Sequence, residues 1–197
     1  MRIGVFGGAF DPVHYGHLLL AEQAREQVRL DQVWFVPAAR HPFKATTTVA
    51  PFDRRAEMLR LAVAGHDAFR VDEIEKNRPG LSYTADTLDE LKRQHPGNEF
   101  FLLVGSDTLP DLPKWHEPQR IVRAATLVIR ERPGFPITPL ADLQAAIGEP
   151  VRIEIITVPL NDLSSHDIRK RVAQDRSIRY MTPRAVEVYI REKGLYR

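Results

Sequence analysis

The 197-residue sequence contains no cysteine, which excludes disulfide bonds, thiolate metal sites and a cysteine nucleophile. It also lacks an apolar run of the roughly 18 residues that a membrane-spanning helix needs. The first residues, MRIGVFGG, are typical of a strand followed by a turn, because their apolar stretch is too short for the core of a signal peptide. These features favour a cytoplasmic protein with no membrane partner.

A strong excess of one charge is missing as well. Lys and Arg number 28 against 26 Asp and Glu, so the formal net charge at pH 7 is only +2. A nucleic-acid-binding protein usually carries a basic patch or stripe, often with aromatic side chains on which bases stack. We therefore expect small-molecule substrates and no nucleic-acid partner.

Short β-branched or aromatic runs alternate with longer segments of helical spacing along the chain. The predicted strands are residues 2–6, 32–37, 69–74, 99–105, 126–131 and 152–158, and the predicted helices are 16–28, 52–64, 82–94, 117–125, 164–174 and 182–194. This alternation predicts one α/β domain over residues 1–197, with a doubly wound, mostly parallel sheet and C-terminal helices. Such sheets bind ligands outside the carboxyl ends of their strands, near the reversal of strand order.

For two of the predicted helices, the sequence also predicts which residues are buried or cap the helix. In helix 52–64 the buried face is expected to hold Met58 and Leu59, whereas Arg55 faces water or a ligand. In the last helix Thr182 is predicted as the N-cap, with Pro183 at the first helical position.

Residues 4–17, GVFGGAFDPVHYGH, join the first strand to the first helix. Gly7 and Gly8 let the backbone turn sharply and approach a ligand without a Cβ in the way. The helix that follows begins with free N–H groups that favour an anion. His14 and His17 are three residues apart at that helix start, so both rings can reach one patch and donate to a polyphosphate. On spacing alone, a tight turn with two partly exposed histidines explains the stretch equally well. Zinc is disfavoured because no third ligand with comparable spacing is evident.

Residues 163–169, LSSHDIR, predict a second helix N-terminus suited to phosphate. Ser164 and Asp167 follow the spacing of a capping box. Arg169 lies one turn into the helix and can supply charged donors to phosphate oxygens. Taken alone, however, the segment is better explained as an ordinary capped helix with a solvated arginine.

Three further segments have polar or aromatic residues in informative places. Asp107 follows Gly105 at a strand end, where it would either accept hydrogen bonds from ribose hydroxyls or cap the next helix. Trp115 lies in a polar stretch, where its ring would either stack on a flat ligand or close the loop. Residues 82–84, Ser-Tyr-Thr, begin a helix whose free N–H groups can receive a carboxylate. Lys44 is a candidate phosphate contact.

The first of these motifs resembles the nucleotidyltransferase signature G-x-F-x-P-x-H-x-G-H, and the matching residues are Gly8, Phe10, Pro12, His14, Gly16 and His17. LSSHDIR resembles the Ile-Ser-Ser-Thr-x-x-Arg element of the same superfamily, with His166 in place of the usual Ser or Thr. Five further segments resemble elements of bacterial nicotinate-nucleotide adenylyltransferases: residues 37–44, 78–91, 102–116, 128–134 and 189–197. The resemblance covers essentially the whole chain.

This resemblance implies a Rossmann-like enzyme that transfers the adenylyl group of ATP to nicotinate mononucleotide, giving nicotinate adenine dinucleotide and pyrophosphate for NAD synthesis. The implied ATP-binding residues are Gly7, Gly8, Ala9, Phe10, His14, His17, Gly105, Asp107, Ser164, Ser165 and Arg169, of which His14, His17 and Arg169 are catalytic. The implied residues for the pyridine nucleotide are Lys44, Ser82, Tyr83, Thr84, Trp115 and Arg132. Ala9 stands where the family commonly has Thr or Ser, so one hydroxyl is missing while the backbone N–H is kept. Mg²⁺ is expected to arrive on the phosphates of ATP, because no carboxylate cluster suggests a protein metal site.

Two alternatives stay open. Another adenylyltransferase with the same histidine motif, such as a pantetheine-phosphate adenylyltransferase, should lack the Ser-Tyr-Thr segment and the element ending at Trp115 together. A non-catalytic nucleotide sensor would explain His166 and Ala9, although both motif histidines and Arg169 are intact. The sequence carries no signal for a particular oligomeric state.

Overall fold

The computed structural model describes residues 1–197 except 41–49, 132–133, 135 and 160. Its strands are β1 (Arg2–Gly8), β2 (Gln32–Pro37), β3 (Phe69–Val71), β4 (Glu99–Gly105), β5 (Ala125–Arg130) and β6 (Ile153–Ile156). Neighbouring strands run parallel, in the order β3-β2-β1-β4-β5-β6. The prediction of a doubly wound parallel sheet is confirmed. The strand order reverses between β1 and β4, so a ligand is expected at the carboxyl ends of these two strands.

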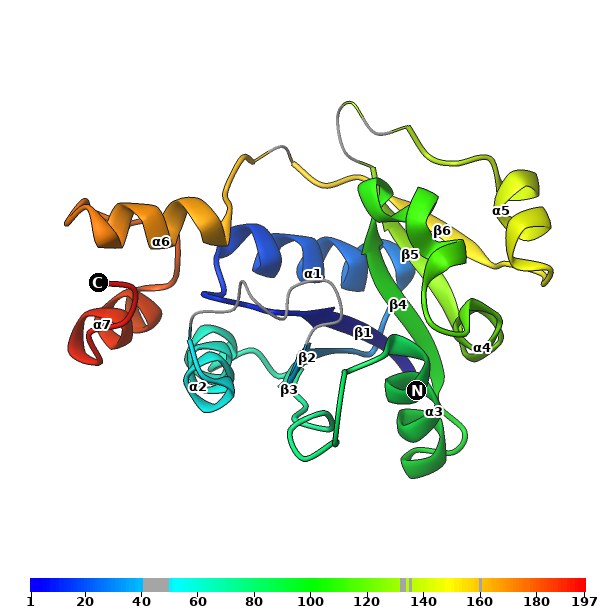
Figure 1. Ribbon diagram of the computed structural model, residues 1–197, viewed down its shortest axis with the longest axis horizontal. Coiled ribbons are helices and arrows are strands. Elements are labelled where there is room, and N and C mark those ends of the chain that lie inside the picture. The colour runs from blue at the N-terminus through cyan, green and yellow to red at the C-terminus, as the bar shows by residue number, and fades with distance from the viewer. Residues whose placement is uncertain (41–49, 132–133, 135, 160) are drawn as a thin grey trace.

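Helices cover both faces of this sheet (Figure 1). One face packs against α1 (Tyr15–Val28), α2 (Phe52–Val63), α6 (Ser165–Ala173) and α7 (Arg184–Glu192). The other face packs against α3 (Thr84–Gln94), the 3-10 helix η1 (Ser106–Lys114), α4 (Pro118–Ala124) and α5 (Leu140–Ile147). Among the described residues, no helix is both long enough and apolar enough to cross a membrane.

Each central strand contributes to two apolar cores. In β2, Trp34 and Val36 pack with α3 and α4, whereas Val33 and Phe35 pack with α1 and α2. Successive side chains of a strand point to opposite faces of the sheet. Because both faces are covered, the strands appear in the sequence as nearly continuous apolar runs.

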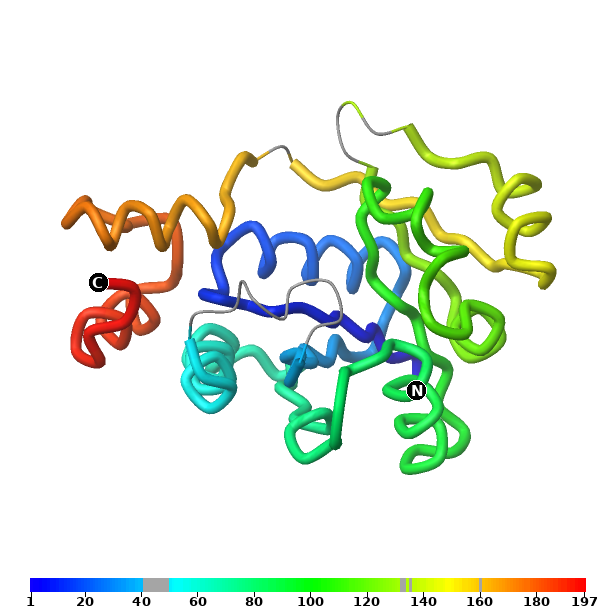
Figure 2. The backbone as a smooth tube through the Cα atoms, viewed as in Figure 1, coloured from blue at the N-terminus to red at the C-terminus, as the bar shows by residue number. Residues whose placement is uncertain are grey.

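The chain path brings the C-terminal residues back to the beginning of α1 (Figure 2). There α7 begins at Arg184 with Pro183 as its N-cap, so the prediction that Thr182 caps this helix is wrong. The Thr182 hydroxyl instead donates to the carbonyl of Val13 at 2.8 Å. A second difference is α5, which lies in a segment where no element is predicted.

Candidate active site

The loop of residues 9–17 leaves the carboxyl end of β1 and carries both motif histidines; we call it the histidine loop. His14 is the N-cap of α1, and His17 is the third residue of the helix. Their rings stack, with centroids 3.7 Å apart and planes inclined by 30°. The spacing therefore brings the two imidazoles together as predicted, and their contact follows from purely local geometry.

The hydrogen bonding fixes the proton of His17. The backbone N–H of His14 donates to Nδ1 of His17 at 3.2 Å. In a neutral imidazole, one nitrogen that accepts leaves the other as the donor. His17 therefore carries its proton on Nε2 and offers a neutral N–H donor at the N-terminus of α1.

His14 is more deeply buried than a turn histidine was expected to be, with only 6% of its surface exposed. Burial lowers the pKa of His14 from 6.5 to about 4, so the ring is neutral at pH 7. Its Nδ1 is buried with no hydrogen-bond partner among the described residues. Gly16 explains how the ring fits, because a Cβ at this position would lie 3.0 Å from that Nδ1 and 2.6 Å from Oδ1 of Asn161. A side chain at position 16 would therefore require Asn161 to move and the His14 ring to shift by a few tenths of an ångström.

The side chains predicted to bind phosphate from α6 hold the backbone of the histidine loop. Arg169 Nη1 donates to the carbonyl of Asp11 at 2.7 Å, and Ser165 Oγ donates to the carbonyl of Pro12 at 2.8 Å. The Arg169 side chain keeps 20% of its surface exposed. Ser164 caps α6 by accepting from the N–H of Asp167, as the capping-box spacing predicts. Arg169 and Ser165 thus contact the backbone of the same loop that carries the two histidines.

Arg55 also holds this loop, and sequence reasoning missed it. Only 2% of its surface is exposed, so the expectation that it faces water or a ligand is wrong. Its guanidinium donates to three carbonyls, those of Ala9 (2.7 Å), Ala38 (2.8 Å) and Ala50 (3.1 Å). Burial lowers the pKa of Arg55, and the nearby Asp11 carboxylate opposes this shift. Helical spacing offered a signal, because Arg55 stands four residues before the buried Leu59 and therefore on the core face of α2.

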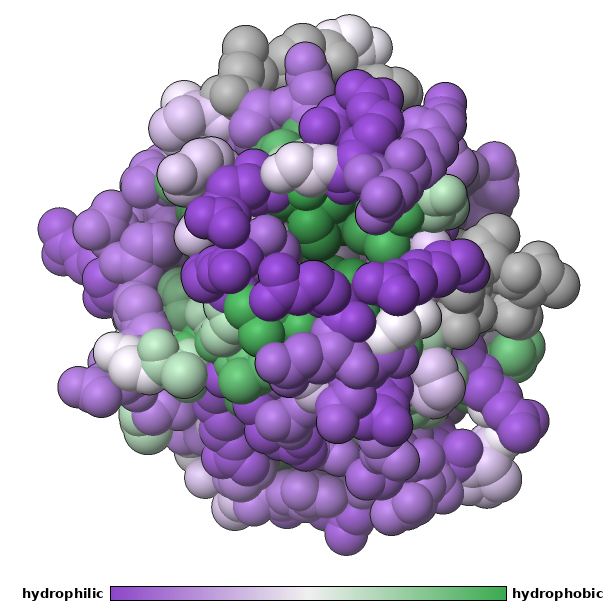
Figure 3. Space-filling model, turned by 90° about the vertical axis from the view of Figure 1, so that its left-hand side faces the viewer, coloured by the Kyte–Doolittle hydropathy of each residue, from purple (hydrophilic) through white to green (hydrophobic). Residues whose placement is uncertain are grey.

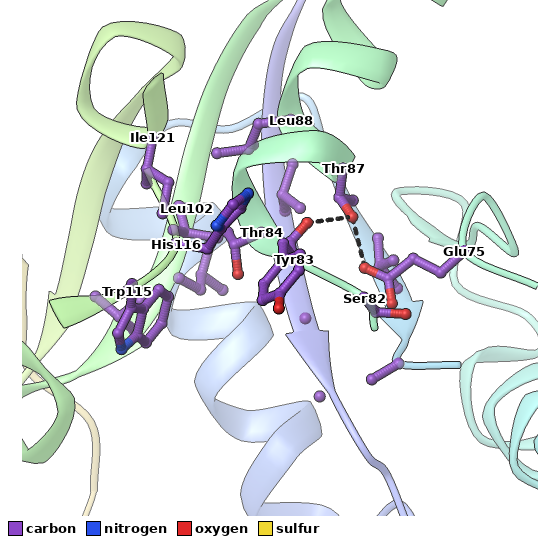
Figure 4. Close-up of a pocket in the computed structure, with 17 residues that line it drawn as sticks. Glu75, Ser82, Tyr83, Thr84, Thr87, Leu88, Leu102, Trp115, His116 and Ile121 are labelled. Carbon is purple, nitrogen blue, oxygen red and sulfur yellow. Dashed lines mark hydrogen bonds between the residues drawn. The ribbon is translucent and has the colours of Figure 1, made fainter. Parts of the chain in front are cut away.

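A cavity of about 130 Å³, the apolar pocket, lies beside the histidine loop (Figure 4). Its floor is formed by residues near the carboxyl ends of β1, β2 and β4, and its walls by the start of α3 and the segment around Trp115. Gly7 and Gly8 line it, and a Cβ at Gly7 would meet open space. The switch point between β1 and β4 therefore holds a cavity, as the topology predicts.

The three residues of the Ser-Tyr-Thr segment all line the apolar pocket, as does Trp115. Tyr83 is the N-cap of α3, and Thr84 is the first helical residue. The first N–H groups of a helix have no partner within it, so the start of α3 offers donors to an anion in the pocket. The ring of His116 lies against Tyr83, with centroids 4.1 Å apart, and extends the aromatic wall (Figure 4).

A buried polar chain supports that start of α3. The Thr87 hydroxyl donates to Glu75 Oε1 at 2.6 Å and accepts from Arg78 Nη1 at 2.7 Å. The other oxygen of Glu75 accepts from the N–H of Ala39, just beyond β2, at 3.3 Å. Glu75 therefore links α3 to the end of β2 through hydrogen bonds. It is only 6% exposed, and sequence reasoning had not identified it.

Comparison with known proteins assigns the family. The profile of the cytidylyltransferase-like family matches residues 5–171. A "Probable nicotinate-nucleotide adenylyltransferase" of Thermus thermophilus is 48% identical over 197 residues, covering 100% of both chains. One of the same name from Exiguobacterium sibiricum is 44% identical, covering 100% of this chain and 99% of its own. The chain belongs to the nicotinate-nucleotide adenylyltransferase family.

Solved structures agree in fold with this family. The nicotinic acid mononucleotide adenylyltransferase of Plasmodium falciparum, complexed with NaAD, superposes with a TM-score of 0.81. The alignment covers 99% of this chain and 97% of that one at 22% identity, so the shared feature is the fold.

The other residues implied by the family resemblance lie around the same strand ends or outside the described residues. Gly105 ends β4, and Asp107 lies in the first turn of η1. Lys44 and Arg132 lie outside the described residues. Phe10 is buried with a positive φ of 49°, and its ring stands edge-on to that of His17, at 5.1 Å between centroids.

Within the described part of the chain, one group of possible metal ligands occurs near the apolar pocket. Ligand atoms of Asp86, His116 and Glu117 lie within 4.8 Å of one another. Both carboxylates already pair with Arg120, which donates to Asp86 at 3.0 Å and also to Glu117. Because the guanidinium already neutralises these carboxylates, the group has the character of a surface ion-pair network.

Proposed function

We propose that this chain transfers the adenylyl group of ATP to nicotinate mononucleotide and releases pyrophosphate, forming nicotinate adenine dinucleotide. One observation carries the proposal: β1 passes along the apolar pocket at Gly7 and Gly8 and then enters the histidine loop. A pyridine ring in the pocket and a triphosphate at the loop would thus meet at the end of one strand. The names of the relatives in the family support the same reaction.

The reaction needs positioning more than acid–base chemistry. A phosphate monoester has its second pKa near about 6, so nicotinate mononucleotide already carries the attacking oxygen largely ionised at pH 7. This oxygen forms a bond to the α-phosphorus of ATP while the bond from that phosphorus to the pyrophosphate oxygen breaks. Alignment of the two phosphates and stabilisation of the developing charge supply the catalysis. A neutral His14, which cannot act as a strong acid, fits this requirement.

In this mechanism the histidine loop binds the triphosphate. The Nε2–H of His17 donates to the α-phosphate in the transition state, and His14 donates beside it. Arg169 and Ser165 bind the β- and γ-phosphates. The bond from Arg169 to Asp11 uses one of the five N–H donors of a guanidinium, so others serve the phosphate. The backbone of Gly7, Gly8, Ala9 and Phe10 completes the cradle.

The apolar pocket would bind the pyridine ring and select the acid over the amide. Trp115 offers a ring for stacking, and the N–H groups at the start of α3, near Ser82 and Thr84, would receive the nicotinate carboxylate. Asp107 would accept from a ribose hydroxyl. Lys44 and Arg132 remain predicted contacts for the pyridine nucleotide.

Mg²⁺ would enter as the complex with ATP. The side chains around the histidine loop are imidazoles, a guanidinium and a hydroxyl, whereas Mg²⁺ prefers carboxylate and phosphate oxygens. The Asp11 carboxylate is buried and accepts from the Tyr196 hydroxyl. We therefore place Mg²⁺ on the phosphates of ATP and not on the described side chains of this loop.

The test is pyrophosphate release from ATP and Mg²⁺ with three acceptors at equal concentration: nicotinate mononucleotide, nicotinamide mononucleotide and 4′-phosphopantetheine. We expect fast release with the first acceptor only. Equal rates with the two pyridine nucleotides would retain adenylyl transfer but refute the carboxylate site at α3. Pyrophosphate release with 4′-phosphopantetheine alone would show that this compound, and not nicotinate mononucleotide, is the acceptor. Binding of ATP without release for any acceptor would indicate a nucleotide sensor.

A further inference from the structure

C-terminal residues hydrogen-bond to four backbone groups of the histidine loop, namely the carbonyls of residues 11–13 and the N–H of Tyr15. Besides the bonds from Arg169 and Ser165, the Thr182 hydroxyl donates to Val13 O, and the N–H of Tyr15 donates to Met181 O at 3.1 Å. In Figure 1, α6 and α7 lie at the same end of the molecule as the start of α1. The outer surface at this end is mostly hydrophilic, with apolar side chains visible between the polar ones (Figure 3). The loop is thus shaped largely by a part of the chain more than 150 residues away.

Tyr196, next to the last residue, takes part in this arrangement through Asp11. Its hydroxyl donates to Asp11 Oδ1 at 2.6 Å, and the two residues are 9% and 2% exposed. Burial and the Asp11 charge raise the pKa of Tyr196 well above its usual range, so the phenol keeps its proton and acts as a donor. The same carboxylate oxygen accepts from the N–H of Ala50 at 3.3 Å.

The position of Asp11 bears directly on Arg169. Arg169 Nη1 contacts the Asp11 carbonyl at 2.7 Å and lies 4.0 Å from Asp11 Oδ2, at the outer limit of an ion pair. The Tyr196 hydroxyl holds the opposite oxygen, Oδ1. Without this bond, a buried carboxylate lacking one donor would turn toward a cation to recover the lost interaction. Arg169 is within reach and would be drawn away from a phosphate.

We infer that Tyr196 is a positioning residue for ATP, acting through Asp11 on Arg169 and on the backbone of the histidine loop. This inference rests on the proposed binding of the triphosphate at that loop. It gives the C-terminal tyrosine a role in substrate affinity that is separate from the packing of its ring in the core.

The test compares Tyr196→Phe with Tyr189→Phe. Tyr189 is a tyrosine of α7 whose hydroxyl accepts from Arg54 at an exposed site, so it provides a matched control. Tyr196→Phe keeps the ring and removes only the donor. We expect it to weaken ATP binding about tenfold, because a displaced Arg169 would lose a hydrogen bond to the charged phosphate, and losing such a bond usually has an effect of this size. The KM for nicotinate mononucleotide should stay within twofold, and Tyr189→Phe should change neither value.

Direct titration of ATP and Mg²⁺ without acceptor separates this inference from the proposed function. If the wild-type chain binds no ATP, both fall together. If it binds ATP and Tyr196→Phe binds equally well, the inference alone is overturned. Parallel losses of affinity for both substrates would also overturn it, because they indicate general damage. Asp11→Asn supplies a second check: when Asp11 mediates the effect, adding Tyr196→Phe to Asp11→Asn weakens ATP binding no further.

Discussion

Side-chain donors hold the backbone of the histidine loop, whereas apolar side chains form most of the walls of the apolar pocket. Arg55, Arg169 and Thr182 each donate to carbonyls of residues 9–13. One polar chain, through Glu75 and Thr87, also lines the pocket and holds the start of α3. The difference matches the two ligands proposed. A flexible triphosphate needs donors fixed in advance, while a flat ring needs a cavity of matching shape.

The histidine loop and the apolar pocket should respond differently to substitution. A buried charge is stable only while its partners remain, so removing one member of the network around the histidine loop leaves others unpaired. Apolar walls lose contact area in proportion to the atoms removed. We therefore expect large, cooperative effects at the histidine loop and graded effects at the apolar pocket.

The largest effect is expected for Arg55→Met, which keeps an apolar stem but removes every bond to the three carbonyls. Asp11 would lose one of its two neighbouring positive charges at the same time, the other being Arg169. Loss of one partner from a buried charged network costs about 3–5 kcal/mol, and we expect a decrease of that size in the free energy of unfolding. Urea denaturation measures it. Arg54→Met is the matched control, because Arg54 is exposed on the same helix, and it should cost less than about 0.5 kcal/mol. Equal decreases in the free energy of unfolding for the two variants would contradict the structural role of Arg55.

Next in size is the effect of His17→Ala on turnover. The Nε2–H of His17 is proposed to donate in the transition state, and loss of one such fixed donor lowers kcat about 100-fold. The KM for nicotinate mononucleotide should change little, since His17 is not among the residues that line the apolar pocket. His95→Ala is a suitable control, because His95 lies beside Trp34 at the end of α3. A near-normal kcat for His17→Ala would exclude His17 from the transition state.

The third prediction concerns pH. His14 has a pKa of about 4 in the folded chain against 6.5 for an ordinary histidine, so between these values the unfolded chain binds more protons. Stability should therefore fall as the pH decreases through that window. From pH 7 to pH 5 the loss from this group is about 2 kcal/mol.

Urea denaturation at pH 7, 6 and 5 checks this value in the wild type and in His14→Gln, which cannot titrate. Comparing the slopes with pH, and not the absolute stabilities, removes any constant cost of the substitution. Identical slopes in the two proteins would show that His14 does not have a depressed pKa.

The features that the sequence predicted arise from residues close together in the chain, whereas the features it missed join residues far apart in the chain. The parallel sheet follows from apolar runs, and the stacking of His14 and His17 follows from a spacing of three residues at a helix start. In contrast, Tyr196 and Asp11 are 185 residues apart, and Arg55 and Ala9 are 46 apart. No local pattern connects such pairs, because only the folded chain brings them together. The motif residues were thus predictable, while the residues that hold them in place mostly were not.

The smallest expected effect belongs to Trp115 in the apolar pocket. Stacking of a pyridine ring on an indole contributes about 1 kcal/mol beyond the buried area, so Trp115→Ala should raise the KM for nicotinate mononucleotide about fivefold. The KM for ATP should remain within twofold, because the contacts around the histidine loop do not involve Trp115. Trp115→Phe keeps an aromatic face and should lie between the wild type and the alanine variant. If Trp115→Ala instead weakened the binding of both substrates alike, the histidine loop and the apolar pocket would not be separate binding surfaces. The structural difference between the two regions would then not correspond to two different ligands.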